Sequence, residues 1–394
     1  MTVAGRIFIR KGRDGPIRGG NPWIFSQAIA RVEPSTLTSG DVVEILDAGG
    51  DLLGLGYFNA STTIAVRVLA FGARVSADRL VEQRLADALR MRSRIIAPDT
   101  NCYRLVNGDG DGLSGVVVDR YADVVVLQLL THGADRMRGE IVSALKALIS
   151  PRTILERSLG AVRRQEGLPD RVGLLEGEAA GETIAVENAI KLAIDLEQGQ
   201  KTGYFLDQRE NRQVIRRLAH DARVLDLCCY AGGFMLAALA GGAAAVTGVD
   251  TSARALTSAR RNLELNGYSP DRVSLFQGET GRFLGGDPGQ FDLVVLDPPP
   301  LARSLKDAPN AGRLYTDLNS LAMKTVAAGG YLMTFSCSAH FHGEDFVRAV
   351  RMAQNRAQRQ FRVVAHLGPG PDHPVLLGHP EGEYLTGLML ARIG

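Results

Sequence analysis

The sequence is poor in cysteine and lacks long apolar runs, and each shortage excludes a class of protein. Four cysteines in 394 residues, two of them adjacent at Cys228 and Cys229, are too few and wrongly spaced for a disulfide framework or a CxxC zinc site. No apolar run approaches the roughly 18 residues of a membrane span, and the early arginines are not followed by the apolar core of a signal peptide. We therefore expect a cytoplasmic protein without a metal site and without a membrane partner.

Charge of one sign is also scarce overall, because charged residues make up 22% of the chain and the net charge is only +2. The first 31 residues differ, since six arginines and lysines there accompany the single acidic residue Asp14. Such a cluster suits the phosphate backbone of a nucleic acid, and it suits a solvated protein surface equally well. With 45% hydrophobic residues, the length of 394 predicts two or three folded domains.

The order of the patterns predicts three modules. Residues 1–72 are predicted to form a small β-rich module, because runs of valine, isoleucine and leucine flank the turn signature DAGGD. Residues 73–190 are predicted to form a middle α+β module that begins with a helix over 76–96, capped by Ser76. Residues 191–394 form the third predicted module.

The middle module contains a misleading glycine pattern. Gly110, Gly112 and Gly115 match GxGxxG, which in a dinucleotide site must follow a strand and open a helix. Here the pattern opens the β-rich run VVVDRYADVVVLQLL, which folds back at residues 119–123. The sequence therefore predicts a β-hairpin at this position, and nucleotide binding there is disfavoured.

From Arg223 onward, strand and helix patterns alternate. The β runs include RVLDLCC, AAVTGVD, VSLFQGE, FDLVVLDPP and GGYLMTFSCS, with helical patterns between them. Alternating β and α units predict a parallel sheet with helices on both faces, so the expected fold class of this module is α/β and Rossmann-like. Ligands of such sheets bind at the carboxyl ends of the strands.

The first of these strands carries Asp226, and the turn after it carries Gly232 and Gly233. Glycine lets a ligand approach the backbone closely, and the following helix N-terminus offers N–H groups. Asp250 ends the next strand, where a carboxylate can accept hydrogen bonds from ribose hydroxyls. A dehydrogenase would share the ribose contact, but Asp226 would repel its pyrophosphate. A cofactor with a positive amino group fits better, and the set resembles the S-adenosylmethionine (SAM) site of class I methyltransferases.

Two further strand ends carry acids. Glu279 resembles the acid that often lies near the adenine in such folds, and a solvated loop glutamate is the ordinary alternative. Asp297 is followed by Pro298 and Pro299, which cannot continue a hydrogen-bonded ladder and would form a rigid lip. Given a SAM site, this acid followed by prolines resembles methyltransferase motif IV, where the substrate base is held.

Cys337 ends the strand YLMTFSCS, on the same predicted edge of the sheet. A buried cysteine that packs as a small hydrophobe is the ordinary alternative. C5 of cytosine is too weak a nucleophile to attack a methyl sulfonium directly, whereas addition of a thiolate to C6 makes C5 enamine-like. Asp297, protonated or hydrogen-bonded to N3, would draw electron density from C6. Cys337 and Asp297 thus form a candidate pair of nucleophile and electrophilic assistant.

Eight blocks that span nearly the whole chain in order resemble the bacterial 23S ribosomal RNA 5-methylcytosine methyltransferase family that carries an N-terminal PUA domain. They are GNPWIFSQAI, NGDGDGLSGVVVDRY, ILERSLGAVRRQEGL, KTGYFLDQRENR, VLDLCCYAGGF, LDPPP, SCS and DHPVLLGHPEGEYLTGL, of which KTGYFLDQRENR is the most specific. The resemblance implies a PUA domain over 1–72, a middle domain over 73–190 that helps to cradle RNA, and a SAM-dependent methyltransferase domain over 191–394.

The resemblance also implies roles for individual residues. Cys337 would be the nucleophile and Asp297 the base-positioning acid. The residues implied to hold SAM are Asp226, Tyr230, Ala231, Gly232, Asp250, Thr251, Glu279, Phe205, Asp207 and Arg209. The last three precede the first strand of the sheet, where they could reach the cofactor or the target base, or belong to an interdomain linker anchored by an ion pair. Apart from the resemblance, the residues predicted to contact the substrate are the prolines Pro298 and Pro299 and the basic residues Arg157 and Arg163.

Two departures keep other functions open. Many RNA 5-methylcytosine methyltransferases carry a second cysteine in motif IV that assists product release, and Pro299 stands in its place here. The motif DPPP also resembles the (D/N)PP(Y/F) of amine methyltransferases, which need no cysteine. The alternatives are therefore an RNA amine (guanine-N2 type) methyltransferase and a non-catalytic RNA-binding assembly factor. The expected partner is 23S ribosomal RNA, naked or in an assembly intermediate, and a homodimer is left open.

Overall fold

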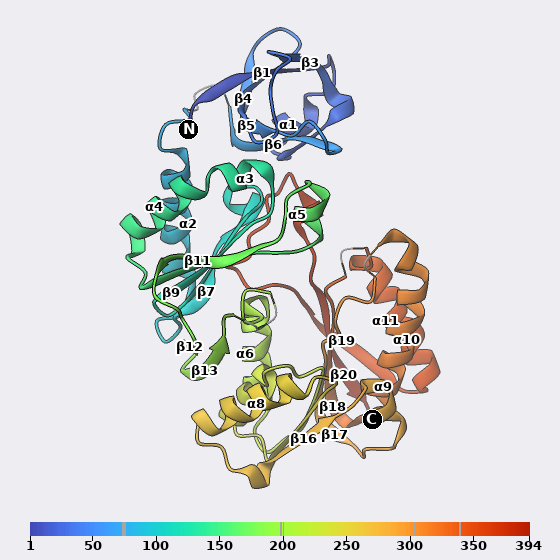
Figure 1. Cartoon of the computed structure of the whole chain (residues 1–394). Coiled ribbons are helices and arrows are strands. Elements are labelled where there is room, and N and C mark those ends of the chain that lie inside the picture. The colour runs from blue at the N-terminus through green and yellow to red at the C-terminus, as the bar shows by residue number, and fades with distance from the viewer. Residues whose placement is uncertain (73–75, 198, 200, 303, 339) are drawn as a thin grey trace. The chain divides into compact units, whose positions relative to one another are not determined.

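The computed structural model describes residues 1–394 except 73–75, 198, 200, 303 and 339, and the chain forms two compact units (Figure 1). Unit 1 consists of Met1–Thr183, Asp195–Gly203 and Pro371–Gly382, and unit 2 consists of Ile184–Ile194, Tyr204–Gly370 and Glu383–Gly394. Both units are therefore discontinuous in sequence. The predicted module boundary after residue 72 adjoins 73–75, which lie outside the described residues, and it stays a prediction, as does the boundary at 190.

The first sheet of unit 1 has six strands in the order β2-β6-β5-β4-β1-β3. Strands β4 and β5 pair antiparallel across the DAGGD turn, which confirms the predicted hairpin. Ile7, Val43 and Val66 lie in the core of this sheet. Its elements are β1 (Val3–Ile9), α1 (Gly15–Arg18), β2 (Trp23–Phe25), η1 (Ser26–Ala28), β3 (Ile29–Glu33), β4 (Val42–Leu46), β5 (Leu52–Phe58) and β6 (Ile64–Phe71).

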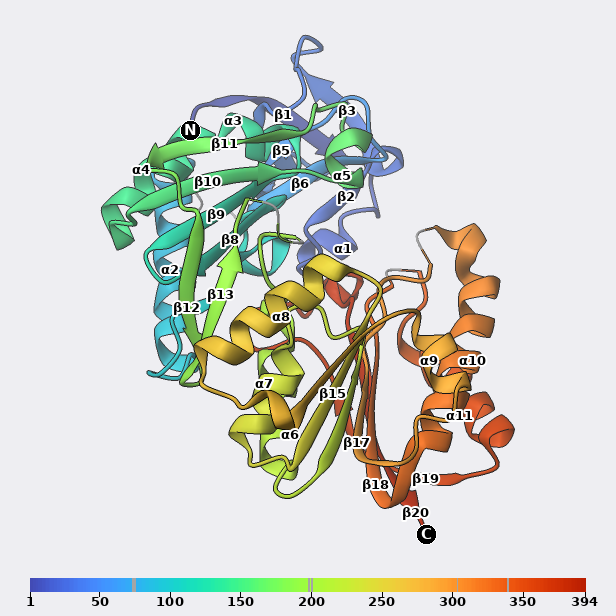
Figure 2. The same ribbon diagram turned by 60° about the horizontal axis from the view of Figure 1, so that its bottom comes forward.

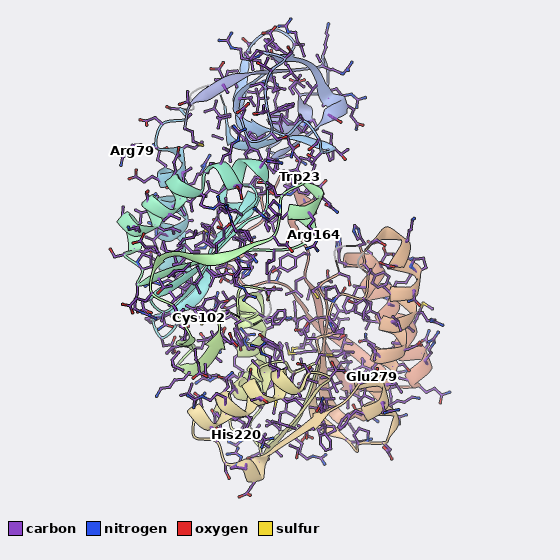
Figure 3. The ribbon with its side chains drawn as sticks, viewed as in Figure 1. Trp23, Arg79, Cys102, Arg164, His220 and Glu279 are labelled. Carbon is purple, nitrogen blue, oxygen red and sulfur yellow. The ribbon has the colours of Figure 1, made fainter. Side chains whose placement is uncertain are left out.

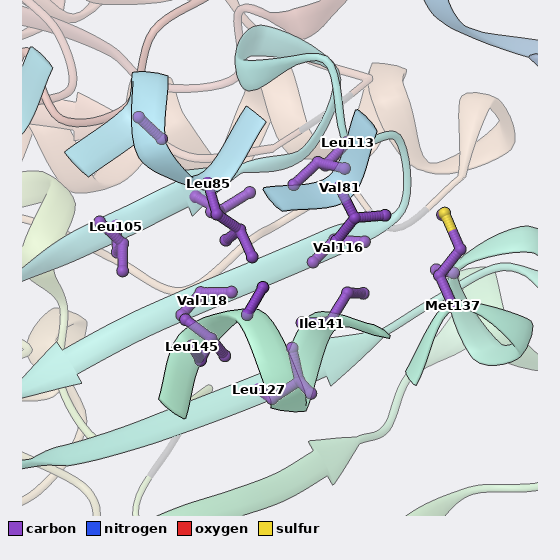
Figure 4. Packing of buried hydrophobic residues seen from close by; sticks show 14 of the residues in the cluster. Val81, Leu85, Leu105, Leu113, Val116, Val118, Leu127, Met137, Ile141 and Leu145 are labelled. Carbon is purple, nitrogen blue, oxygen red and sulfur yellow. The ribbon is translucent and has the colours of Figure 1, made fainter. Parts of the chain in front are cut away.

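The second sheet of unit 1 has five strands in the order β11-β10-β9-β8-β7. Figure 4 shows how Leu85 of helix α2 and Ile141 of helix α4 pack with Val118 of β8, which removes apolar surface from water. The elements are α2 (Leu80–Ile95), β7 (Cys102–Asn107), η2 (Gly108–Asp111), β8 (Val116–Tyr121), β9 (Val124–Leu129), α3 (His132–Arg136), α4 (Arg138–Ile149), β10 (Thr153–Ser158), α5 (Ala161–Gln165) and β11 (Arg171–Gly177).

The predicted helix over 76–96 exists, but the prediction that Ser76 caps it is wrong. Helix α2 begins at Leu80, after Arg79 in the left-handed conformation with φ 52°. The Ser76 hydroxyl accepts a hydrogen bond from the backbone N–H of Asp78 at 3.1 Å. This hydroxyl therefore closes a turn ahead of the helix, whereas a cap must accept from an N–H inside the first helical turn.

The glycine pattern of unit 1 leads into a strand, as predicted. After the short helix η2 the chain enters β8, which pairs antiparallel with β9 and confirms the hairpin. Gly110 faces the backbone carbonyl of Pro374 so closely that a Cβ there would overlap it. The glycine thus serves close packing with the segment Pro371–Gly382 within unit 1.

That segment is bound within unit 1 by polar and aromatic contacts. Arg92 donates to the carbonyl oxygen of Asp372 at 2.7 Å, and the Asp372 carboxylate accepts from the backbone N–H of Arg104 at 2.9 Å. Trp23, labelled in Figure 3, lies edge-on to His379 with ring centroids 4.4 Å apart. Its indole N–H donates to Asp109 at 3.2 Å, so Trp23 is a half-buried packing residue of unit 1.

Unit 2 is built on a seven-stranded sheet with the order β16-β15-β14-β17-β18-β20-β19. The first five strands in this order pair parallel, which confirms the prediction from β/α alternation. The last two pair antiparallel, a feature that the alternation did not predict. The strands are β14 (Arg223–Leu227), β15 (Ala245–Asp250), β16 (Val273–Gln277), β17 (Phe291–Leu296), β18 (Val326–Ser336), β19 (Gln360–Leu367) and β20 (Thr386–Ile393).

Helices cover both faces of this sheet: α6, α7 and α8 lie on one face and α9, α10 and α11 on the other (Figure 2). None of the helices that the structure describes is both long and apolar enough to cross a membrane. The remaining elements of the chain are β12 (Glu182–Glu187), β13 (Ile190–Asp195), η3 (Leu206–Gln208), α6 (Arg209–Leu218), α7 (Gly233–Ala240), α8 (Ala253–Leu265), η4 (Pro270–Arg272), α9 (Thr280–Gly285), η5 (Leu305–Asp307), α10 (Ala308–Thr325), α11 (Gly343–Ala357) and η6 (Pro380–Gly382).

The parallel register brings four strand ends to one edge of the sheet. Leu227 of β14 is paired with Val249 of β15 and with Leu296 of β17, and Leu296 is paired with Thr334 of β18. The residues that follow these strands therefore lie along the same edge. We call the ends of β14 and β15 the cofactor side and the ends of β17 and β18 the base side.

Candidate active site

Asp226 is the most deeply buried acid of the cofactor side, with 1% of its surface exposed. Among the residues that the structure describes, neither oxygen of its carboxyl group has a hydrogen-bond partner of ordinary geometry. Burial raises the pKa of the Asp226 carboxyl well above its usual range, and the negative charges of Asp297 and Asp250 add to the shift, while the backbone N–H of Met235 opposes it. Such a group is costly unless a ligand completes it.

The turn between β14 and α7 has an unusual backbone conformation. Cys228, Tyr230 and Gly232 all have positive φ, at 64°, 49° and 79°. Glycine adopts this conformation without steric cost, and Gly232 stands directly before the first residue of α7. A Cβ on Gly233 would overlap the Tyr204 hydroxyl, so this position also requires glycine. The glycine at this position therefore lets the Tyr204 side chain pack directly against the backbone at the start of α7.

Asp250, at the end of β15, holds the same turn in place. One carboxylate oxygen accepts from the backbone N–H of Tyr230 and the other from that of Ser252, both at 2.9 Å. Ala231, between Tyr230 and Gly232, is fixed through its carbonyl oxygen by Asn262 at 3.1 Å. The strand end and the glycine turn thus form one connected structure.

Thr251 and Glu279 lie at the ends of neighbouring strands and are exposed. Glu279, labelled in Figure 3, stands immediately before α9, and the backbone N–H of the preceding Gly278 donates to the Asp250 carbonyl at 3.0 Å. The Thr251 carbonyl accepts from Gln277 at 3.4 Å. The structure therefore keeps both residues beside Asp250 on the cofactor side.

Asp297 is the acid of the base side, and it follows β17 directly. Its carboxylate accepts a hydrogen bond from Nε2 of Gln208 at 3.0 Å. Its backbone N–H donates to the Leu227 carbonyl of β14 at 3.4 Å, which ties the base side to the cofactor side. Pro298, the next residue, is buried, whereas Pro299 is exposed.

Cys337 follows β18 and lies beside the Asp297 motif. Its Sγ is 3.7 Å from the carbonyl oxygen of Pro298, at the limit of a thiol hydrogen bond. The thiol is half-buried, while both neighbouring serines have no exposed surface. The structure thus brings together Cys337 and Pro298, which are 39 positions apart in the sequence.

The two serines explain this difference in burial. Ser338 Oγ accepts from the backbone N–H groups of Leu301 and Ala302 at 3.0 and 3.3 Å, so it clamps the loop that follows the prolines. Ser336 Oγ donates to the Phe341 carbonyl at 2.6 Å, and both serine hydroxyls are hydrogen-bonded to Tyr315 Oη. Because the serines are anchored inside, Cys337 between them is held on the side of Pro298.

The segment before β14 contributes unevenly. Phe205 lies edge-on to Tyr230, with ring centroids 5.3 Å apart, and so reaches the glycine turn. Asp207 is buried, and it accepts from the Tyr384 hydroxyl at 2.8 Å and, through its carbonyl, from Gly370 at 2.9 Å. Arg209 is buried and paired with Glu210 at 3.2 Å. Asp207 therefore holds residues on both sides of the segment Pro371–Gly382, namely Gly370 and Tyr384. The cofactor roles of Asp207 and Arg209 stay predictions.

Comparison with known families decides the class of this site. The family described as S-adenosylmethionine-dependent methyltransferase matches residues 158–374, more than half of the chain, and a PUA-like domain matches residues 7–71. The chain belongs to the S-adenosylmethionine-dependent methyltransferase family. The expected fold class, a PUA-like domain and a class I methyltransferase fold, is confirmed, and so is SAM as the cofactor.

Relatives and solved structures resemble this methyltransferase over nearly its whole length. Two relatives are named ribosomal RNA large subunit methyltransferase I. The protein of Photobacterium profundum is 37% identical and the alignment covers 98% of each chain, and that of Aeromonas hydrophila is 38% identical over 98% of this chain and 99% of its own. A Streptococcus mutans protein described as a SAM-dependent methyltransferase has a TM-score of 0.82 at 20% identity, covering 99% of this chain and 100% of its own. A structure described as a methyltransferase complexed with SAH has a TM-score of 0.83 at 21% identity with the same coverage.

The residues of the cofactor side fit SAM on structural grounds. The Asp226 carboxyl, which has no hydrogen-bond partner of ordinary geometry among the described residues, suits a ligand that brings a positive charge, because such a charge compensates the burial of a carboxylate. Gly232 has a positive φ and directly precedes α7, and the N-terminus of a helix offers backbone N–H groups to a ligand. When bound, SAM supplies a methyl group made electrophilic by its sulfonium.

Arg157 and Arg163 lie in unit 1, and protein atoms engage both guanidinium groups. Arg157 donates to the carbonyl oxygens of Leu196 and Gly199 at 2.9 and 2.8 Å. Arg163, with 1% of its surface exposed, donates at 2.6 Å to two carbonyl oxygens, those of Leu129 and Pro169, and pairs with Asp135. These contacts give both arginines a structural role, and their contact with the substrate stays a prediction.

Sequence reasoning missed Gln208, Ser338 and Tyr315. Gln208 stands inside KTGYFLDQRENR, the most specific block, so the signal was present without an assigned role. Ser338 belongs to the SCS block, and its clamp on the loop after Pro299 depends on a partner that the sequence does not name. Cys228 and Cys229, to which no role was given, are packing residues of the turn, and burial raises the pKa of Cys228 to about 12.

Proposed function

We propose that this methyltransferase transfers a methyl group from SAM to C5 of a cytosine in 23S ribosomal RNA. The names of its relatives support the RNA of the large ribosomal subunit as the substrate. The observation that carries the choice of C5 is the Cys337 thiol, 3.7 Å from the Pro298 carbonyl beside Asp297. A cysteine kept only for packing would be expected to turn inward as its serine neighbours do, since free cysteine is among the most buried residue types.

The chemistry of C5 explains why a thiol is useful at this place. The Cys337 thiolate adds to C6, an S–C6 bond forms, and the electron pair of the C5–C6 double bond shifts toward N3, which takes up a proton. C5 is then enamine-like and nucleophilic. After C5 is methylated, loss of its proton to a base restores the C5–C6 double bond, and the S–C6 bond breaks to return the thiolate. No residue is assigned here as that base.

Asp297 is assigned to N3 of the target base. A carboxyl group there can donate or accept the N3 proton as the thiolate adds and leaves, so it assists both steps. Pro298 and Pro299 form the lip against which the base lies, because their fixed φ keeps the backbone of this loop rigid. Both faces of the ring must be open, so a paired cytosine has to be flipped out of its helix.

The cofactor side divides the binding of SAM among its residues. Asp226 is assigned to the amino group, Gly232 with Tyr230 and Ala231 to the backbone turn, and Asp250 with Thr251 to the ribose. Glu279 is assigned to the adenine. Phe205 packs on Tyr230 and closes the turn. These assignments are supported by the burial of Asp226 and by the positive φ values of the turn.

An RNA amine methyltransferase is the second candidate, and the Asp297-Pro298 motif favours it. In such an enzyme the acid and a backbone carbonyl hold an exocyclic amine. Here the thiol of Cys337 faces the Pro298 carbonyl, which is one of the acceptors that an amine would need. This contact favours the cytosine-C5 function.

The first test is methyl transfer from labelled SAM to unmodified 23S ribosomal RNA, followed by nucleoside analysis. Wild type and the control Cys102→Ala, a cysteine of β7 in unit 1, are expected to form 5-methylcytidine. Cys337→Ala is expected to form none above background, because the covalent step is lost. Label on guanine, or equal activity of Cys337→Ala, would overturn the proposal.

RNA that contains 5-fluorocytidine sharpens this test. Fluorine at C5 cannot leave as a proton does, so the restoring elimination stops and the S–C6 bond persists. Wild type is expected to form a denaturant-resistant complex with this RNA in the presence of SAM, and Cys337→Ala is expected to form none. A persistent complex of Cys337→Ala would assign the nucleophile to another residue.

A further inference from the structure

Gln208 is a buried amide that reaches the base side from outside the strand ends. It lies in η3, directly before α6, and only 2% of its surface is exposed. Its Nε2 donates to Oδ2 of Asp297 at 3.0 Å. The two residues are 89 positions apart in the sequence, so this contact exists only in the folded unit 2.

A second amide fixes which end of Gln208 faces Asp297. The Gln208 Oε1 accepts from Nδ2 of Asn211 at 2.6 Å, and Asn211 also donates to the Gly368 carbonyl at 2.9 Å. Since Oε1 is engaged as the acceptor, the NH₂ group of Gln208 is the part presented to the carboxylate. Asn211 is itself buried in α6, so the hydrogen-bonded pair of Asn211 and Gln208 is held in a fixed position.

A neutral donor on one carboxylate oxygen has a specific physical effect. The carboxyl group of an aspartate rotates easily, because its terminal torsion is broad. A hydrogen bond from a fixed amide selects one orientation of the carboxyl plane and favours the charged form. Yet the amide brings no positive charge, so the carboxyl group keeps the ability to exchange a proton with a base.

We propose that Gln208 is a positioning residue that holds the Asp297 carboxyl group in the orientation in which it meets the target base. The proposal rests on the proposed function only in that Asp297 contacts the base. It does not depend on which base atom receives the methyl group. It adds to the base side a series of hydrogen bonds that runs from the Gly368 carbonyl through Asn211 and Gln208 to Asp297.

The first experiment compares Gln208→Leu with Gln213→Leu, a half-buried glutamine of the adjoining helix α6. Labelled SAM and unmodified 23S ribosomal RNA are the probes, and all modified nucleosides are counted. Gln208→Leu is expected to lower kcat about 10- to 100-fold, the worth of one hydrogen bond to a charged group, with SAM affinity within about 3-fold of wild type. Gln213→Leu is expected to keep wild-type kcat. A wild-type kcat in Gln208→Leu, or a loss of SAM affinity equal to the loss of kcat, overturns the proposal.

A pH profile separates positioning from simple packing. Loss of the amide donor removes a partner of the charged carboxyl, so the acidic limb of the Gln208→Leu profile is expected to move to higher pH. In Gln208→Glu a protonated glutamic acid can donate in place of the amide. The activity of Gln208→Glu relative to wild type is therefore expected to rise as the pH falls from about 8 to 6. A flat ratio contradicts the proposal.

A double-mutant cycle tests the contact without any substrate. Unfolding of Gln208→Leu, Asp297→Ala and the double variant is measured in urea, and coupling of about 5- to 10-fold in the unfolding equilibrium constant is expected. Independent effects of the two changes would overturn the proposal even if the RNA proved not to be a substrate. Conversely, label on a base other than cytosine with a low kcat in Gln208→Leu would overturn the proposed function and support the role of Gln208.

Discussion

The two sides of the candidate active site differ in how the protein surrounds their acids, the buried Asp226 and the half-buried Asp297. On the cofactor side, Asp226 has no hydrogen-bond partner of ordinary geometry among the described residues. On the base side, the Asp297 carboxylate is bound by the amide of Gln208, and the loop behind it is clamped by Ser338. In the proposed function, SAM would compensate the Asp226 carboxyl, whereas the Asp297 carboxyl is already held by Gln208.

The difference follows from what each side must do. A group that binds a charged cofactor can be left uncompensated, because binding then relieves the cost of burial and gains affinity. A group that meets a reacting base must be held in one geometry, since misplacement slows the chemical step. At one edge of the sheet, the burial of Asp226 therefore costs stability, while hydrogen bonds fix the geometry around Asp297.

The largest effect is expected from Asp226→Asn. Asparagine keeps the shape but removes the negative charge, so SAM affinity should fall about 100-fold, which corresponds to one hydrogen bond to a charged group. Isothermal titration with SAM measures this, and Asp271→Asn, an exposed aspartate of η4, is the matched control. Unchanged affinity in Asp226→Asn would mean that the Asp226 carboxylate does not bind the amino group of SAM.

Ser338→Ala is expected to act on the base side alone. Its removal leaves the N–H groups of Leu301 and Ala302 without their acceptor, at a cost of about 1–3 kcal/mol in the free energy of unfolding. The rate of methyl transfer should fall while SAM affinity stays near wild type. Urea unfolding, with Ser93→Ala of α2 as the exposed control, measures the first part. An equal loss of SAM affinity would show that the two sides are not independent.

The stability of the cofactor-free protein should depend on pH through Asp226. Its pKa is raised in the folded state, so the folded protein binds more protons than the unfolded chain between the ordinary value of 3.8 and the raised one. Stability is therefore lost as the pH rises through this window. At neutral pH Asp226→Asn should unfold about 2–4 °C above wild type, a shift typical of about 1 kcal/mol, and the difference should vanish near pH 4. Thermal unfolding without SAM measures this difference in unfolding temperature. If Asp226 instead stabilised the protein, Asp226→Asn would unfold below wild type.

Cys228→Ala is expected to have the smallest effect. Burial raises the pKa of the Cys228 thiol to about 12, so this cysteine stays a neutral thiol at pH 7. Its thiol contacts Thr280 at 3.4 Å, and no step of the proposed reaction uses it. Both kcat and SAM affinity should stay within about 3-fold of wild type. A loss as large as that of Cys337→Ala would remove the distinction between the two cysteines.

Much of the candidate site could be predicted because its residues lie at the ends of strands or directly after them. The alternation of strand and helix placed Asp226, Asp250 and Asp297 at strand ends, and parallel register alone then brings those ends to one edge. Gly232 could be predicted because a positive φ before a helix favours glycine. The roles of these residues in binding and catalysis stay predictions.

The contacts that the sequence did not predict share a different cause, because they depend on which partner the fold brings to a side chain. Ser76 matched the capping pattern, but its hydroxyl closes a turn one step before the helix. The substrate contact of Arg157 and Arg163 stays a prediction, but the sequence did not indicate that carbonyl oxygens of their own unit bind both side chains. A residue type states which bonds a side chain can make, and it does not state which partner the fold delivers.

The sequence by itself determined the local features of this protein: the β/α alternation, the acids at strand ends, the glycine turn and the cysteine between two serines. These depend on periodicity, on φ and on residue chemistry, which short stretches of chain carry. Only the tertiary structure decided that Gln208 binds Asp297, that Ser336 and Ser338 face inward so that Cys337 faces Pro298, and that Pro371–Gly382 belongs to unit 1. Those contacts join residues far apart in the chain, and packing of the whole unit selects them.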